Sequence, residues 1–111
     1  MKMKSVDQGI PVEGPEGVIR KTLAYDDEAM LCHFTLKAGA RIPLHSHRAV
    51  QVGYVISGKM LFKGESPDDE FQVKKGDSYI FSADKTHGAE VVEDAEFVEV
   101  FTPAREEYKD F

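Results

Sequence analysis

The stretch LHSHRAVQVGYVISG, residues 44–58, places His45 and His47 one residue apart and Gln51 four residues after the second histidine. Alternate side chains of an extended strand point to the same face, and all three positions are odd-numbered. The two imidazoles would lie roughly 6–7 Å apart along the backbone, which lets them converge on one ion. Imidazole is the commonest transition-metal ligand in proteins, and an amide oxygen is a harder companion. The spacing therefore indicates a metal site, although Gln51 could instead be an ordinary buried amide.

Short β-rich runs separated by turn signals surround this stretch. Turn residues recur every eight to twelve positions, with no convincing helical period between them. Such spacing favours an all-β antiparallel sandwich or barrel. We expect strands over 17–25, 29–37, 49–58, 59–64, 71–77, 78–83, 86–93 and 95–103, with room for a helical turn only in the tail that follows.

The composition is that of a folded globular chain and excludes several partners. At 111 residues the chain is long enough for one core, so we expect a single domain over 1–111. Lys and Arg are scattered and the net charge is −6, which argues against nucleic acid or an anionic membrane surface as partner. One cysteine, no apolar leader segment and no membrane-length apolar run predict a cytoplasmic protein that does not enter membranes.

The run AEFVEVF, residues 95–101, carries a second candidate group. Period-2 alternation puts Phe97, Glu99 and Phe101 on one face, and Val98 and Val100 on the other. A carboxylate flanked by two phenylalanines on one strand face is unusual for a residue without a function. Apolar residues on the reverse face imply a second layer or a partner that covers them, and we expect a homodimer.

Two motifs resemble those of the cupin superfamily, small jelly-roll β-barrels with a metal at the centre. Residues 39–58 read G-x5-H-x-H-x3-Q-x6-G, and residues 76–91 begin with GDSYIFSADKTH. The first motif in that family usually carries Glu at the position of Gln51. The second usually carries Pro and Gly at the positions of Ser82 and Asp84, and often ends with Asn at Val91. The resemblance implies a single-domain cupin barrel.

The resemblance also implies a ligand set, made up of His45, His47, Gln51 and His87. It would hold one divalent transition metal, with zinc, nickel or manganese favoured and iron or copper also compatible. Four protein donors leave one or two coordination positions free, which is typical of a working site. Because Gln51 is neutral where the family has a carboxylate, the ion keeps its full charge. Such a centre should favour small anionic substrates, such as sugar acids or other carboxylates.

The combination of HSH, Gln51, YVISG and the later FTPAREEY resembles the pectin-degradation cupins, which convert unsaturated uronates into linear keto-uronates. The resemblance assigns the catalytic carboxylate to Glu99, where that subfamily has Asp, and arginines that bind the substrate carboxylate to Arg105 and Arg20. Glu99 would act as general acid or base. The alternatives are structural: Glu99 could pair with an arginine, and Arg105 could anchor the tail against the barrel.

Three classes of function follow. The first is a metal-dependent isomerase or lyase-type cupin enzyme that linearises an unsaturated uronate. The second is a metal-dependent cupin dioxygenase, although a neutral ligand set suits iron less well than a set that contains a carboxylate. The third is a non-enzymatic cupin that binds a sugar acid. Oxygen consumption separates the second from the first, and stabilisation by a ligand without turnover indicates the third.

Overall fold

The computed structural model describes residues 1–110, which form one antiparallel sheet of eight strands. Helical structure in this part of the chain is limited to three single 3-10 turns, at Val6–Gln8, Pro67–Asp69 and Glu106–Tyr108. The strands are β1 (Pro11–Glu13), β2 (Val18–Tyr25), β3 (Met30–Leu36), β4 (Arg41–His45), β5 (Val50–Lys63), β6 (Phe71–Lys74), β7 (Ser78–Phe81) and β8 (His87–Thr102). Their order along the sheet is β1-β2-β3-β8-β5-β6, with β4 paired to β8 and β7 paired to β5.

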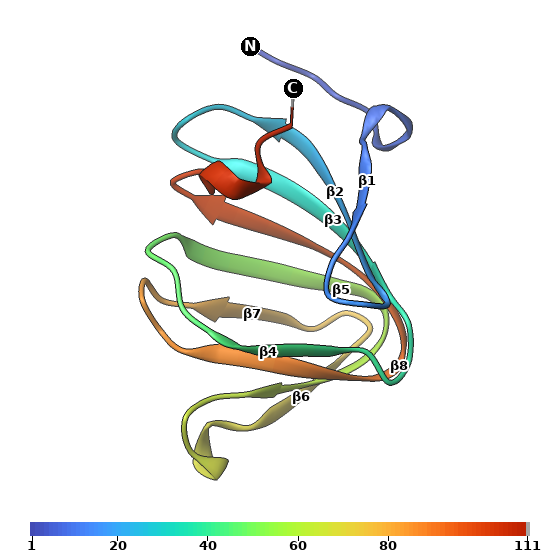
Figure 1. Ribbon diagram of the computed structural model, residues 1–111, viewed down its shortest axis with the longest axis vertical. Coiled ribbons are helices and arrows are strands. Elements are labelled where there is room, and N and C mark those ends of the chain that lie inside the picture. Colours follow the sequence, from blue (N-terminus) through green and yellow to red (C-terminus); the bar gives the residue numbers. More distant parts are fainter. Residues whose placement is uncertain (111) are drawn as a thin grey trace.

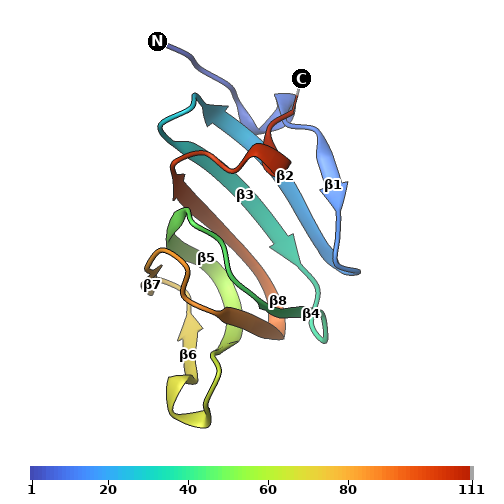
Figure 2. The same ribbon diagram turned by 60° about the vertical axis from the view of Figure 1, so that its left-hand side comes forward.

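The two long strands, β5 and β8, run through both halves of the molecule and bend sharply midway. The β5–β8 register shifts between Val55 and Met60, around Gly58, which has a φ of +85°. A Cβ at Gly58 would lie 2.1 Å from the carbonyl oxygen of Asp94, so only glycine fits this bend. Figures 1 and 2 show the strands folding back on themselves at one end, while the connecting loops gather at the other.

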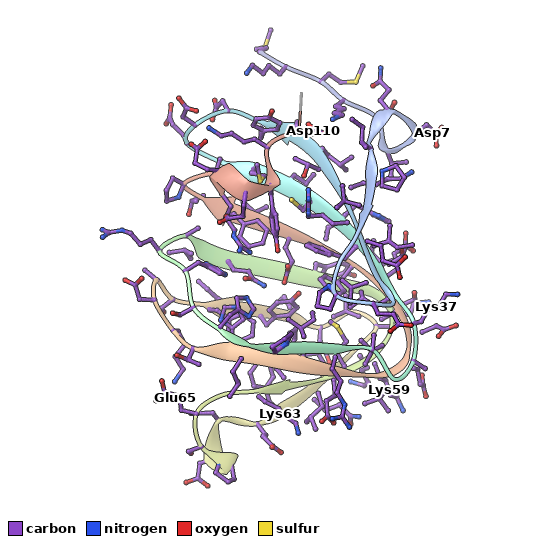
Figure 3. The ribbon with its side chains drawn as sticks, in the orientation of Figure 1. Asp7, Lys37, Lys59, Lys63, Glu65 and Asp110 are labelled. Carbon is purple, nitrogen blue, oxygen red and sulfur yellow. The ribbon has the colours of Figure 1, made fainter. Side chains whose placement is uncertain are left out.

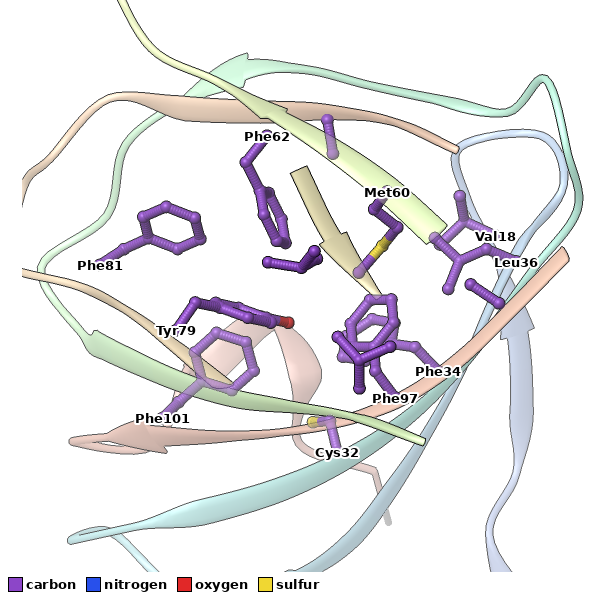
Figure 4. Packing of buried hydrophobic residues seen from close by; sticks show 14 of the residues in the cluster. Val18, Cys32, Phe34, Leu36, Met60, Phe62, Tyr79, Phe81, Phe97 and Phe101 are labelled. Carbon is purple, nitrogen blue, oxygen red and sulfur yellow. The ribbon is translucent and has the colours of Figure 1, made fainter. Parts of the chain in front are cut away.

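The bend divides the sheet into two layers that face one another. Before it, β5 pairs with β7 and with the second half of β8, which continues through β3 and β2 to β1. Beyond it, β5 pairs with β6 and with the first half of β8, which also carries β4. Apolar side chains from both layers meet between them (Figure 4), among them Phe34, Met60, Phe62, Phe97 and Phe101. Charged side chains such as Lys37, Lys59 and Glu65 project outward (Figure 3).

The expected all-β antiparallel architecture is confirmed, with differences in detail. Residues 86–93 and 95–103 form one continuous strand, β8, and the runs on either side of Gly58 form the single strand β5. Strands β1 and β4 lie in segments where none was expected. The backbone pairing over residues 1–110 forms an open, bent sheet, because no strand pair joins the β1 edge to the β6 edge. No helix in the described residues is both long and apolar enough to cross a membrane.

Candidate metal centre

Three histidines converge because β4, β8 and the connection between β4 and β5 meet at the loop-bearing end of the molecule. β4 ends at His45, β8 begins at His87, and these two residues are direct partners in the β4–β8 register. His47 lies in the short connection between β4 and β5, and its carbonyl oxygen accepts a 2.8 Å hydrogen bond from the backbone N–H of Asp84. That bond ties the β7–β8 loop to the β4–β5 loop, which Figure 1 shows at the same end.

The three imidazoles lie close enough together to share one ion. One nitrogen from each of His45, His47 and His87 lies within 4.8 Å of the other two. The ring centroids are 4.4 Å apart for His45 and His87, 5.1 Å for His47 and His87, and 5.5 Å for His45 and His47. Phe81 stacks on His87, with 4.3 Å between ring centroids and 6° between planes, so this ring is held in place.

A backbone carbonyl defines the tautomer of each histidine. Nδ1 of His45 lies 2.9 Å from the Pro43 oxygen, Nδ1 of His47 lies 2.8 Å from the Ala49 oxygen, and Nδ1 of His87 lies 2.7 Å from the Lys85 oxygen. A carbonyl oxygen can only accept, so each Nδ1 carries the proton and donates it. In each neutral imidazole, Nε2 then keeps its lone pair for an ion, an arrangement typical of metal-binding histidines.

Gln51 completes a group of acceptor atoms that face one another. Its Oε1 lies 3.0 Å from Nε2 of His47 and 3.2 Å from Nε2 of His87. With both Nδ1 atoms protonated, neither neutral Nε2 has a hydrogen to donate to that oxygen. Three lone-pair atoms at such distances require a cation or an extra proton between them. Nitrogen and oxygen donors of this kind suit a divalent transition metal, so these residues fit the ion that the sequence predicts.

Burial favours the uncharged form of His47 and His87, which is the form that binds metal. His87 is almost fully buried, and burial lowers its pKa to about 4. The pKa of His47 is also lowered, first by burial and then by the positive charge of Arg105. His47 and His87 are therefore neutral at neutral pH in the metal-free site.

Glu99 lies directly behind Gln51 on the inner face of the sheet. One of its carboxylate oxygens, Oε2, accepts hydrogen bonds from the Gln51 side-chain amide and from the Tyr79 hydroxyl, the latter at 2.6 Å. Glu99 is 4% exposed, and burial raises its pKa to about 7, although Tyr79, Gln51 and Arg105 all act in the opposite direction. A carboxyl group with this pKa can both give and take a proton near neutrality.

The two predicted arginines lie on opposite sides of one tyrosine of the C-terminal segment. The guanidinium carbon of Arg105 lies 4.0 Å from the centroid of the Tyr108 ring, and that of Arg20 lies 4.2 Å from it. Arg105 also lies over Phe101 and bonds to Glu107 at 2.9 Å. Arg20 donates to the Tyr108 carbonyl oxygen at 3.3 Å and to the Thr22 hydroxyl, contacts that fasten the C-terminal segment.

A small cavity of about 40 Å³ joins three of the four candidate metal ligands to Glu99. Its wall includes His45, Gln51, His87, Glu99 and Arg105, together with Tyr108 and aromatic core residues, whereas neither His47 nor Arg20 is part of it. A wider surface hollow of about 970 Å³ lies between the β1–β2 and β3–β4 turns, where no predicted site residue contributes. We assign the chemistry to the smaller cavity because polar groups of unusual pKa converge there.

Sequence reasoning missed two residues of this network, Tyr79 and Gly53. They are direct partners in the β5–β7 register, and Gly53 is also the partner of Glu99 in the β5–β8 register. A glycine in the middle of an apolar strand often marks a place where another group approaches closely, and that signal was present at Gly53. Nothing in the local sequence separates Tyr79 from an ordinary core tyrosine.

The fold and the histidine cluster define the class to which this protein belongs. Residues 32–101 match the family described as the Cupin domain, so the chain belongs to the cupin family. The family resemblance drawn from the two motifs is thereby confirmed. In the second motif, Asp84 has a φ of +62°, a left-handed conformation that Asp tolerates better than most residues and that suits the glycine usual at this position.

Several solved structures are similar to this one. An RmlC-like cupin from Shewanella frigidimarina is 25% identical, with a TM-score of 0.88 over 98% of this chain and 96% of that chain. KdgF from Halomonas sp. is 24% identical, with a TM-score of 0.86 over 97% of this chain and 100% of that chain. An oxalate decarboxylase from Lactobacillus farciminis is 20% identical, with a TM-score of 0.82 over 100% of this chain and 36% of that chain. The likenesses below 25% identity establish the shared fold alone, and no curated protein sequence matches the chain significantly.

Proposed function

We propose that this protein is a metal-dependent cupin enzyme that linearises an unsaturated uronate, with His45, His47, Gln51 and His87 as metal ligands. The observation that carries the proposal is that three of these ligands, His45, Gln51 and His87, line one cavity together with a buried carboxyl group, Glu99. KdgF from Halomonas among the similar structures, and the resemblance of the HSH and FTPAREEY segments to the pectin-degradation cupins, support this reaction class.

A metal held by these residues would act as a Lewis acid toward a carboxylate or hydroxyl oxygen of the substrate. Glu99 would exchange a proton with the reacting carbon or hydroxyl, because its pKa of about 7 leaves both protonation states accessible. Arg105 would bind the substrate carboxylate through paired hydrogen bonds from its guanidinium group. Arg20, from its place behind Tyr108, would act by holding that wall of the cavity in position.

The dimensions of the cavity set how much of the substrate it can take. About 40 Å³ has room for only a few water molecules, so only the reacting end of a sugar acid would enter. The rest of the molecule would lie outside the cavity. A small anionic substrate of this kind matches a centre whose protein ligands are all neutral.

The test begins with the metal content of tag-free protein, measured by mass spectrometry beside a His45→Ala/His47→Ala double variant. We expect about one divalent ion per native chain and none in the variant. Turnover of an unsaturated uronate is then followed by the loss of its ultraviolet absorbance, with Glu99→Gln as the inactive comparison. Oxygen consumption with a small organic acid would instead support a dioxygenase, and stabilisation by a uronate without turnover would support a binding protein. Absence of metal even after reconstitution would overturn the proposal.

We also propose that a second copy of the chain covers the outer face of β7, β5 and β8. Three apolar side chains, Ile80, Val52 and Val100, lie side by side across these strands in direct register. All three are exposed, and Tyr54 continues the apolar surface on β5. Contiguous exposed apolar surface of this kind is characteristic of an interaction site. Light scattering measures the mass of the native protein in solution and decides between monomer and homodimer.

A further inference from the structure

Tyr79 approaches the candidate metal centre from a neighbouring strand, and its hydroxyl bonds to Glu99 rather than to a predicted ligand. Its side chain is buried, and its hydroxyl donates to Oε2 of Glu99 at 2.6 Å. The same oxygen accepts the side-chain N–H of Gln51. Tyr79 and Gln51 therefore share one acceptor atom, and the hydroxyl holds in place the oxygen toward which the Gln51 amide nitrogen points.

The backbone provides a gap that lets Tyr79 reach this oxygen. Tyr79, Gly53 and Glu99 lie opposite one another on the three adjacent strands β7, β5 and β8. The tyrosine side chain crosses over Gly53: a Cβ at that position would lie 2.2 Å from Tyr79 Cζ and 2.3 Å from its hydroxyl oxygen. Any larger residue at position 53 would displace the tyrosine ring. The contact between Tyr79 and Glu99 therefore depends on glycine at this position.

The orientation of the Gln51 amide decides whether the centre has three or four donors. Oε1 faces the two histidine nitrogens, at 3.0 and 3.2 Å, only while the amide nitrogen faces Glu99. A half-turn of the amide would present N–H groups to the lone pairs of His47 and His87, which would occupy the site in place of an ion. The two amide orientations are therefore in competition, and the position of the Glu99 carboxylate favours the one that can bind metal.

We infer that Tyr79 is a positioning residue that, by holding Glu99 across Gly53, fixes the Gln51 amide with its oxygen toward the metal. The inference rests on the metal centre of the proposed function. In this arrangement Gln51, the predicted ligand, is neutral, and the carboxylate of Glu99 contacts Gln51 from the side away from the ion. Residues in such supporting positions typically change metal affinity by about 10- to 100-fold when they are removed.

The experiment compares Tyr79→Phe with native protein in cobalt(II) affinity, measured by competition with a coloured chelator, and in the visible spectrum of the cobalt form. We expect binding weaker by about 10- to 100-fold and a shifted ligand-field spectrum. Tyr54→Phe removes a hydroxyl from the exposed face of the same sheet and should leave both readouts unchanged. Thermal unfolding of each metal-free variant verifies that the chains are folded.

A second pair of variants tests whether Tyr79 acts through Glu99. If it does, Tyr79→Phe should weaken cobalt binding far less in a Glu99→Gln background than in the native background. Native protein that binds cobalt while Tyr79→Phe shows the same affinity and spectrum would overturn the inference and leave the metal centre standing. An equal loss in both backgrounds would also overturn it. Native protein that binds no metal would defeat the proposed function together with the inference.

Discussion

The two faces of the β7–β5–β8 sheet differ in chemistry although the same backbone builds both. On the inner face, Tyr79, Gly53 and Glu99 lie opposite one another and form a polar network. One residue along, Ile80, Val52 and Val100 lie opposite one another on the outer face and form an apolar surface. A shift of one residue in the pairing register would exchange the two sets, so the candidate site depends on register as much as on residue type.

This comparison shows why the inner face can hold polar groups at all. The buried Glu99 carboxylate accepts hydrogen bonds from Tyr79 and Gln51, so its oxygen is not left without partners in the core. The acceptor atoms of Gln51 and the histidines face one another and remain for an ion. Aromatic residues on the same face, such as Phe97 and Phe101, surround the network and exclude water. The exclusion of water raises the pKa of Glu99 and lowers that of His87.

The largest difference between the faces should appear when an apolar residue is shortened. Phe97 is 2% exposed and stacks on Phe34, with 5.0 Å between ring centroids, so Phe97→Ala should lower the free energy of unfolding by about 3–5 kcal/mol. Val100→Ala, on the outer face, should cost within about 0.5 kcal/mol in the monomer. Urea unfolding measures both. A large loss at Val100 would instead show that the outer face is buried in solution.

The next effect is a pH dependence that belongs to the inner face alone. The pKa of Glu99 is about 7 in the folded protein, above its ordinary 4.5, chiefly because of burial. The folded state therefore binds more protons than the unfolded state between these values, and the stability contributed by this group is lost as the pH rises. In metal-free protein the loss should reach about 3 kcal/mol at most between pH 4.5 and 8.

Glu99→Gln provides the comparison for that measurement. The difference in unfolding free energy between native and variant protein, taken at pH 5 and pH 8, isolates the contribution of this carboxyl group. We expect the unfolding free energy of native protein to fall relative to that of the variant as the pH rises. A difference that stays constant with pH would contradict the raised pKa.

A smaller effect on stability is expected at Gly53, which lies between Tyr79 and Glu99 in the sheet. Gly53→Ala should cost about 1–3 kcal/mol, because the added methyl group would overlap the Tyr79 ring and the core must shift to accept it. Gly14→Ala is the matched control, since a Cβ at Gly14 has no neighbour within 4 Å. Chemical denaturation compares the two variants, and equal stability would show that Tyr79 does not lie over Gly53.

The smallest effect on the stability of a single chain should come from the outer face. Ile80→Lys places a charge on an exposed side chain and should change the unfolding free energy of the monomer by about 0.5 kcal/mol or less. If a second copy covers this face, the same substitution should halve the mass measured by light scattering. Native protein that is already a monomer would remove the basis of the dimer proposal.

Much of this arrangement follows from the sequence because strand periodicity is a local property. Alternation alone places Gln51 on the inner face of β5, and Phe97, Glu99 and Phe101 on the inner face of β8, as the structure has them. The H-x-H spacing likewise predicted that His45 and His47 would lie close together, and their ring centroids are 5.5 Å apart, although His47 lies in the β4–β5 connection and not in the continuous strand that the spacing assumed. Each of these inferences needs only the direction of side chains within one short segment.

Tertiary structure alone decided which segments meet. His87 joins the other histidines because β8 pairs with β4. Tyr79 reaches Glu99 because the β5–β7 and β5–β8 registers meet at Gly53. Arg105 rather than Arg20 lines the cavity because Tyr108 lies between them. These contacts join residues far apart in the chain. Strand periodicity specifies the face on which a side chain lies, but the partner it meets there depends on how distant strands pair and where the sheet bends.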